Sequence, residues 1–290
     1  MHKNIGFIGL GVMGSYMATH LIKKYKFLHI LDRNSLKTKK FIRKYKKHLF
    51  IHERLDKLSQ NCSYIITCVG NDKDLKSVFL SKNGILNGIK EGTNIIDHTT
   101  ASPKLSKDLF KRFMKKKSFF FDAPMSGGEA GAKFGELSIM IGGEKKKINN
   151  IYEILKQYSK SIIYMGKSGS GQLTKMVNQI CVAAVIQGLA EGLNFAKQKK
   201  LNINNLVDVI KNGAGQSWQL ENRAKTMWND RYNFGFMNTL MLKDLNLIFN
   251  EITGSNIKLP ITKIIKKNYK KLVNLGYGKE DTSNLIRLLR

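Results

Sequence analysis

The chain has 290 residues, 42% of them hydrophobic, which is enough for a core in one or two domains. No apolar run reaches the roughly 18 residues that span a membrane, and the first residues lead into an apolar strand without the layout of a signal peptide. The three cysteines show no metal-ligand spacing, and their odd number argues against a disulfide framework. We therefore expect a reduced, cytoplasmic protein with no metal site and no membrane segment.

Lysines and arginines give the chain a formal net charge of +29 at pH 7. They cluster in residues 37–47, 111–117, 145–147 and 263–271, among apolar residues, as expected of the solvated faces of amphipathic helices. A nucleic-acid surface would concentrate the charge and interleave stacking aromatic side chains. We expect non-specific attraction to polyanions at low salt, but no specific nucleic-acid partner.

A glycine-rich turn near the N-terminus follows a predicted buried strand, residues 5–8, and precedes a predicted helix. In this context the pattern G-x-G-x-x-G is typical of dinucleotide binding. The glycines allow a tight turn and let the backbone approach a pyrophosphate at the helix N-terminus. The predicted cofactor-binding residues of this turn are Gly9, Leu10, Gly11, Val12, Met13 and Gly14.

The second predicted strand, residues 27–31, ends at Asp32, 18 positions after Gly14. A carboxylate at this point suits the ribose hydroxyls of NAD and repels the 2′-phosphate of NADP. The adjacent Arg33 could instead accommodate that phosphate. The sequence predicts NAD as the cofactor, with NADP as the alternative.

Further predicted strands occupy residues 63–69, 93–97 and 119–122. Val69 and Gly70 stand where the first of these strands ends, and we expect them to contact the cofactor. Thr100 follows the second strand, where its hydroxyl could contact the cofactor or belong to the cap of a helix opened by Pro103. His98 has no evident carboxylate partner beyond its neighbour in the chain, so we interpret it as a structural loop histidine.

The third of these strands opens onto Ser126, Gly127 and Gly128. They offer a hydroxyl and unobstructed backbone N–H groups, which suit a carboxylate or an oxyanion. The alternative is a flexible glycine turn.

A long helical pattern begins after Ser170, which we expect to be its N-cap, and is apolar on nearly every side. This predicts a buried helix, in which Lys175 is unusual. Asn178 and Gln179 lie beside Lys175 on one helix face. Burial favours the neutral amine and so suits proton transfer. The alternative is a lysine that snorkels into solvent.

Three segments together resemble the β-hydroxyacid dehydrogenase family, which includes 3-hydroxyisobutyrate dehydrogenase and tartronate semialdehyde reductase. They are residues 7–14, 122–128 and 171–179, and a fourth similarity lies at residues 242–245. The resemblance implies an α/β Rossmann-type N-terminal domain, residues 1–165, followed by an all-α C-terminal domain, residues 166–290.

The resemblance also implies roles for individual residues. Lys175 matches the family's catalytic lysine, and Thr100 and Lys243 match cofactor contacts. The substrate-binding matches are Ser126, Gly127, Gly128, Asn178 and Gln179. Many members have two asparagines where this chain has Asn178 and Gln179, and imine-reducing members lack the lysine.

These features predict an NAD(P)-dependent oxidoreductase that acts on a small 3-hydroxy acid or its semialdehyde, with Lys175 as general acid and base. Reductases of 2-hydroxy-3-oxopropionate or succinic semialdehyde are alternatives. A different alternative is a cofactor-binding protein without turnover whose basic surface holds nucleic acid. A homodimer or homotetramer is expected.

Overall fold

A computed structural model describes residues 3–31 and 36–290 of the chain. These residues form two compact units, the first ending at Lys175 and the second spanning residues 176–290. Helix α9 (Ser170–Gln198) runs through this boundary, so its first turns belong to the first unit. The domain boundary expected after residue 165 falls near the end of the last strand of the first unit.

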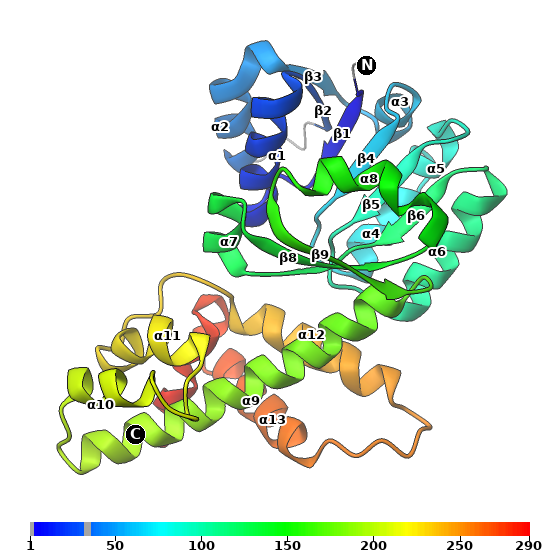
Figure 1. Cartoon of the computed structure of the whole chain (residues 1–290). Helices are drawn as coiled ribbons and strands as arrows, with labels where there is room; N and C mark the ends of the chain where they lie inside the picture. Colours follow the sequence, from blue (N-terminus) through cyan, green and yellow to red (C-terminus); the bar gives the residue numbers. More distant parts are fainter. Residues whose placement is uncertain (1–2, 32–35) are drawn as a thin grey trace. The chain divides into compact units, whose positions relative to one another are not determined.

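The first unit contains a single sheet with the strand order β3-β2-β1-β4-β5-β6-β8-β7, and β9 pairs with β8 (Figure 1). The six strands from β3 to β6 are parallel, in the order typical of dinucleotide-binding folds. Beyond them β8 is antiparallel to β6 and β7 and parallel to β9. The strands are β1 (Ile5–Ile8), β2 (Leu28–Leu31), β3 (Leu49–His52), β4 (Tyr64–Thr67), β5 (Asn94–Asp97), β6 (Phe119–Asp122), β7 (Met125–Ser126), β8 (Leu137–Gly142) and β9 (Ser159–Gly166).

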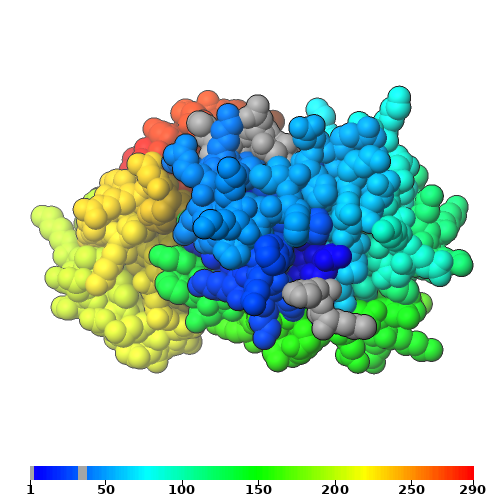
Figure 2. Space-filling model, turned by 90° about the horizontal axis from the view of Figure 1, so that it is seen from above, coloured from blue at the N-terminus to red at the C-terminus, as the bar shows by residue number. Residues whose placement is uncertain are grey.

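Helices cover both faces of this sheet, because a parallel sheet must bury both of its apolar faces. One face packs against α1 (Val12–Tyr25), α2 (Leu36–Tyr45), α7 (Gly128–Phe134) and α8 (Ile148–Leu155). The other packs against α3 (Leu55–Gln60), α4 (Asp72–Leu80), α5 (Ile85–Gly88) and α6 (Pro103–Lys115). Short 3₁₀ turns occupy Lys46–His48 and Lys145–Lys147. In Figure 2 the N-terminal segments coloured blue form a continuous patch on this unit, next to its cyan and green segments.

The second unit is helical, as the sequence predicts. After α9 it contains α10 (Ile203–Ile210), α11 (Trp218–Trp228), α12 (Asn238–Glu251) and α13 (Pro260–Asn274). Two 3₁₀ segments follow, Tyr277–Lys279 and Thr282–Leu289. Its core is built from apolar residues of all these helices, among them the fully buried Met241 and Tyr269. The α/β Rossmann-type unit followed by an all-α unit is therefore confirmed.

The prediction that α9, apolar on nearly every side, is buried is correct for one stripe of the helix only. One stripe of the helix, which includes Ala183 and Ile186, packs into the core of the second unit. On the opposite side Val177 is 61% exposed and Phe195 62% exposed. Among the described helices, α9 alone has the length and composition to cross a membrane. A single helix of this kind is weak evidence for a membrane span, because the core helices of soluble proteins can have the same length and composition.

Candidate active site

The turn between β1 and α1 gives each of its three glycines a separate steric reason. Gly9 has a φ of 102°, and a Cβ there would lie 2.1 Å from the carbonyl oxygen of Cys68. A Cβ on Gly14 would lie 2.0 Å from the carbonyl oxygen of Gly9, so α1 packs on the turn only with glycine. Gly11, the N-cap of α1, is exposed, and no atom of the described residues lies within 4 Å of its Cβ position. The backbone at Gly11 is thus open to a pyrophosphate, as a dinucleotide site requires.

The other three predicted residues of this turn differ in how far their side chains are buried. Leu10 is buried in the core, so only its backbone is available to a ligand. Met13 is partly buried and packs against the same core. Val12, the first residue of α1, is 44% exposed.

The loops after β4 and β5 lie at the carboxyl ends of these strands. The backbone N–H of Val69 donates to Oγ1 of Thr99 over 3.1 Å and ties the two loops together. Gly70 and Thr100 follow directly in these loops. Capping of α6 falls to Ser102, whose Oγ accepts from the N–H of Leu105 over 3.2 Å. The loop after β4 flanks the point beside β1 where the strand order reverses, which is the usual ligand crevice of such sheets. Asp32 and Arg33, the predicted determinants of NAD against NADP, lie outside the described residues.

The segment Ser126, Gly127 and Gly128 is fixed at one end by the sheet. Ser126 belongs to β7 and pairs with Ser138 of β8. Gly127 and Gly128 have φ values of 122° and 62°, are exposed, and lead into α7. No atom of the described residues lies within 4 Å of the Cβ position of Gly128. The backbone here is open, as a seat for a carboxylate requires.

Helix α9 begins one residue earlier than the sequence suggested. Ser170 is the first helical residue and not the N-cap, because the N–H of Leu173 already donates to the carbonyl oxygen of Gly169 over 3.0 Å. The capping acceptor comes from the end of β6: the Asp122 carboxylate accepts from the N–H groups of Gly169 (2.8 Å) and Gln172 (3.1 Å). A carboxylate at a helix N-terminus satisfies unpaired donors and is favoured by the helix dipole.

Lys175 lies in the second turn of α9 and is only 8% exposed. This burial contradicts the alternative of a lysine that snorkels into solvent. The fully buried side chain of Gln172, one turn before it, donates to the carbonyl oxygen of Thr99 (2.8 Å) and accepts from the N–H of Ala101 (3.0 Å). The first turn of α9, which precedes Lys175, is thereby bonded to the loop that carries Thr100.

Asn178 and Gln179 follow in the same helix, within the second unit. The buried Gln179 donates through Nε2 to Oδ2 of Asp244 over 2.7 Å, and its Oε1 accepts from Nδ2 of Asn178 over 2.8 Å. The nearly fully buried Asp244 also forms an ion pair with Nζ of Lys243 at 3.0 Å. One N–H group of Gln179 is thus bonded to a buried carboxylate, and Asp244 connects Gln179 to Lys243. Sequence reasoning missed Asp244, although the match at residues 242–245 contains it.

His98 has a structural environment. Its Nδ1 donates to the carbonyl oxygen of Ala123 (2.6 Å), and its Nε2 accepts from the hydroxyl of Tyr158 (2.9 Å). Burial lowers the pKa of His98 to about 4, so the ring is neutral at pH 7. Both ring nitrogens are engaged, which supports the interpretation as a structural histidine.

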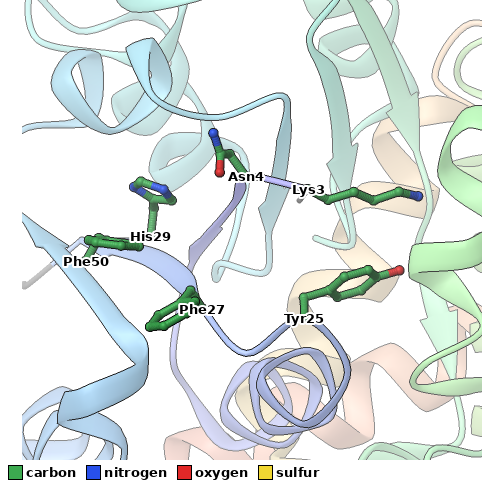
Figure 3. Close-up of a pocket in the computed structure, with 6 residues that line it drawn as sticks. All are labelled: Lys3, Asn4, Tyr25, Phe27, His29 and Phe50. Carbon is green, nitrogen blue, oxygen red and sulfur yellow. The ribbon is translucent and has the colours of Figure 1, made fainter. Parts of the chain in front are cut away.

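A pocket elsewhere in the first unit is lined by Lys3, Asn4, Tyr25, Phe27, His29 and Phe50 (Figure 3). Lys3, Asn4 and Phe27 stand before strands β1 and β2, at the edge opposite the glycine-rich turn. This pocket is therefore separate from the candidate cofactor site. Among the described residues, no group of three His, Cys, Asp or Glu side chains could hold a metal ion.

Two family profiles together span nearly the whole chain. The NAD-binding domain of 6-phosphogluconate dehydrogenase matches residues 4–166. The NAD-binding region of NADP-dependent 3-hydroxyisobutyrate dehydrogenase matches residues 169–289. The chain belongs to the β-hydroxyacid dehydrogenase family. It is accordingly an oxidoreductase that uses NAD(P).

Individual members of the family resemble the chain over its full length. An oxidoreductase of Shewanella frigidimarina is 40% identical over 98% of this chain and 97% of its own length. The mitochondrial 3-hydroxyisobutyrate dehydrogenase of Drosophila melanogaster is 31% identical over 99% of this chain and 90% of its own length. The fold is shared with Mycobacterium tuberculosis 3-hydroxyisobutyrate dehydrogenase, solved with L-serine, at a TM-score of 0.88, 23% identity and full coverage of both chains. It is also shared with Psf3 in complex with NADP+ and 2-OPP, at a TM-score of 0.90, 19% identity and coverage of 99% and 100%.

Proposed function

We propose that this protein interconverts a small 3-hydroxy acid and its semialdehyde, in the manner of 3-hydroxyisobutyrate dehydrogenase. The observation that carries the proposal is the buried Lys175, one helical turn after Gln172, whose side chain is bonded to the loop of Thr100. An amine in this position can exchange a proton with a substrate oxygen. Relatives named as 3-hydroxyisobutyrate dehydrogenases support the substrate class.

The residues of the first unit that would hold the cofactor are the turn from Gly9 to Gly14, Val69, Gly70 and Thr100. The open backbone at Gly11 fits the pyrophosphate, and Asp32 with Arg33 would decide between NAD and NADP. From the second unit, Lys243 is the proposed further contact. When bound, the nicotinamide accepts or supplies the hydride.

The remaining chemistry falls to the chain's own side chains. Lys175 takes the proton of the substrate hydroxyl during oxidation and returns it during reduction, so that one hydride and one proton leave or enter together. Asn178, one turn after Lys175, orients the substrate oxygen. Ser126 and the backbone N–H groups of Gly127 and Gly128 hold the substrate carboxylate.

A panel of hydroxy acids tests this proposal. The acids are 3-hydroxyisobutyrate, glycerate, 4-hydroxybutyrate and serine, each followed by absorbance of the reduced nicotinamide. We expect the highest kcat/KM for 3-hydroxyisobutyrate. A preference for 4-hydroxybutyrate would instead favour the succinic semialdehyde alternative, and preference for glycerate the 2-hydroxy-3-oxopropionate one. No turnover, combined with nucleic-acid binding that persists at high salt, would favour the binding protein without catalysis.

We also propose that the chain works as a homodimer or homotetramer. The exposed apolar stripe of α9, which contains Leu173, Val177, Val185 and Phe195, supports this assembly, because a soluble chain rarely leaves such a stripe uncovered. Sedimentation of Val177→Lys should show smaller particles than wild type. The matched control is Val209→Lys on α10, where the side chain is 68% exposed but outside the stripe. Equal sedimentation of both variants and wild type contradicts the stripe as an interface.

The three free cysteines support the proposed reducing, cytoplasmic setting.

A further inference from the structure

The N-terminus of α9 is tied to the sheet by two buried polar side chains that the proposed chemistry does not itself use. Asp122, at the end of β6, accepts from the N–H of Gly169, from the N–H of Gln172 and from Oγ of Ser168 (3.3 Å). Gln172 in turn bonds to the backbone of the loop after β5 at Thr99 and Ala101. Both side chains are completely buried. The first turn of α9 is therefore bonded to the ends of two neighbouring strands.

Two glycines leave room for the carboxylate of Asp122, and a side chain at either position would collide with it. A Cβ on Gly142 would lie 2.6 Å from Oδ2 of Asp122. A Cβ on Gly171 would lie 2.9 Å from the same oxygen and 2.5 Å from the carbonyl oxygen of Met140. The carboxylate is thus enclosed on both sides, and its orientation toward the helix N-terminus is fixed by packing.

We propose that Asp122 and Gln172 are positioning residues for Lys175, and that the ionised carboxylate of Asp122 is needed to hold the lysine in its working place. Lys175 is three residues after Gln172 and lies on the same helix face. A shift of the first turn would therefore move the lysine with it. This inference rests on the proposed role of Lys175 as general acid and base.

The ionisation of Asp122 links this anchor to pH. Burial raises the pKa of Asp122 to about 6, against the opposing effect of the hydrogen bonds from Gly169, Gln172 and Ser168. A protonated carboxyl has less acceptor capacity and no charge to interact with the helix dipole. The hydrogen bonds from the helix N-terminus lower the pKa of Asp122 and so favour its ionised form. Release of the first turn of α9 while Asp122 stays buried should therefore become easier as the pH falls through this value.

Other titratable groups surround Asp122 and must be separated from it by experiment. Asp97 of β5 is its partner across the ladder. The side chain of Lys107 on α6 lies against Gly169. Tyr164 of β9 donates to the carbonyl oxygen of Gly143, next to Gly142. Lys175 is the titratable residue of the first turns of α9. Asp97 is the other carboxyl among these groups, so an Asp97→Asn variant is needed beside Asp122→Asn.

Hydrogen exchange and chemical labelling of the cofactor-free protein test the anchor without turnover. In Asp122→Asn, exchange of the backbone N–H groups in residues 169–175 should accelerate about 10- to 100-fold, as expected for the loss of a hydrogen bond to a charged acceptor. Lys175 should also react faster with an amine acylating reagent. The control is Asp108→Asn, an exposed carboxylate on α6 that pairs with Arg112. It should change neither rate.

Wild type alone provides a second measurement in case Asp122→Asn does not fold. Exchange of residues 169–175, corrected for intrinsic rates, should accelerate below about pH 6 in wild type and in Asp97→Asn. Unchanged exchange in Asp122→Asn, or no pH dependence in wild type, overturns the anchor.

Kinetics then test the link to Lys175. In Asp122→Asn, kcat should fall about 10- to 100-fold while the Kd of the cofactor stays constant, as for a misplaced catalytic group. In wild type kcat should fall as the pH drops below about 6, and this decrease should be absent in Asp122→Asn. If exchange accelerates in Asp122→Asn but the labelling of Lys175 or kcat stays unchanged, the positioning role is overturned. A failure of the proposed function is distinguishable, because it would leave Lys175→Met active and the exchange results unaffected.

Discussion

The buried carboxyl of Asp97 allows a stability prediction whose size follows from the structure. Its Oδ1 accepts from Oγ1 of Thr67 (2.7 Å) and from the N–H of Thr99 (3.0 Å). Its Oδ2 is buried without a hydrogen-bond partner among the described residues. Burial, reinforced by the neighbouring charge of Asp122, raises the pKa of Asp97 to about 7 and outweighs these hydrogen bonds. Asp97 therefore carries its proton in the folded chain at a pH where the unfolded chain has lost it.

The sign of the effect follows from proton linkage. Between the usual carboxyl pKa of 3.8 and about 7, the folded state binds more protons than the unfolded state. The free energy of unfolding of wild type thus falls as the pH rises through this range. The difference between these two pKa values corresponds to about 4 kcal/mol over the whole window. Asp97→Asn does not titrate, so relative to wild type its unfolding free energy should increase by about 3 kcal/mol between about pH 5 and about pH 8.

Urea denaturation followed by far-UV circular dichroism measures this difference. Both tryptophans, Trp218 and Trp228, lie in the second unit, so tryptophan fluorescence alone would miss the unit that contains Asp97. Asp108→Asn serves as the exposed control and should differ little from wild type at either pH. A difference between Asp97→Asn and wild type that stays constant, or shrinks as the pH rises, would refute the reasoning.

Three further predictions concern the cofactor turn, the cofactor and the charge. Gly11→Ala should leave the melting temperature of the cofactor-free protein within about 2 °C of wild type but weaken cofactor binding in a fluorescence titration. Gly14→Ala should lower the melting temperature, because its Cβ, unlike that of Gly11→Ala, would meet the backbone of Gly9. The kcat/KM for NAD should exceed that for NADP because of Asp32, and the reverse preference would mean that Arg33 dominates. If the net charge of +29 steers carboxylate substrates, kcat/KM should fall as salt rises, since the Debye length shrinks from about 30 Å at 0.01 M to about 10 Å at 0.1 M; a flat profile, with substrate capture shown to limit the rate, contradicts steering.

Local chemistry in the sequence was enough to predict most of the fold and the cofactor turn. Strands β1 and β6 have the predicted limits, and Pro103 opens α6 as the pattern indicated, with Ser102 as the cap. The glycine turn lies between a strand and a helix as expected. In each case the determining contacts are close in sequence, or follow from the alternation of strand and helix.

Contacts between distant residues could not be predicted in this way. The cap of α9 comes from Asp122, 47 residues before Gly169, while the nearby Ser170 offered a local and incorrect candidate. Gln179 donates to Asp244, 65 residues away, which no helix pattern reveals. Periodicity also cannot tell whether the second apolar side of α9 is covered by its own chain or by another. Strands β3 and β9 were not predicted because neither contains a fully buried residue, and the apolar Phe50 and Ile51 of β3 are exposed.

The central claim is that Lys175 transfers the proton, and the most direct measurement is single-turnover reduction of cofactor by the best hydroxy acid of the panel. Lys175→Met keeps the length of the side chain but lacks the amine, and Lys167→Met, an exposed lysine before α9, is the matched control. We expect the rate of Lys175→Met to fall about 10²- to 10⁴-fold, with the cofactor Kd unchanged. The control should match wild type. A Lys175→Met rate within a few-fold of wild type would contradict the claim.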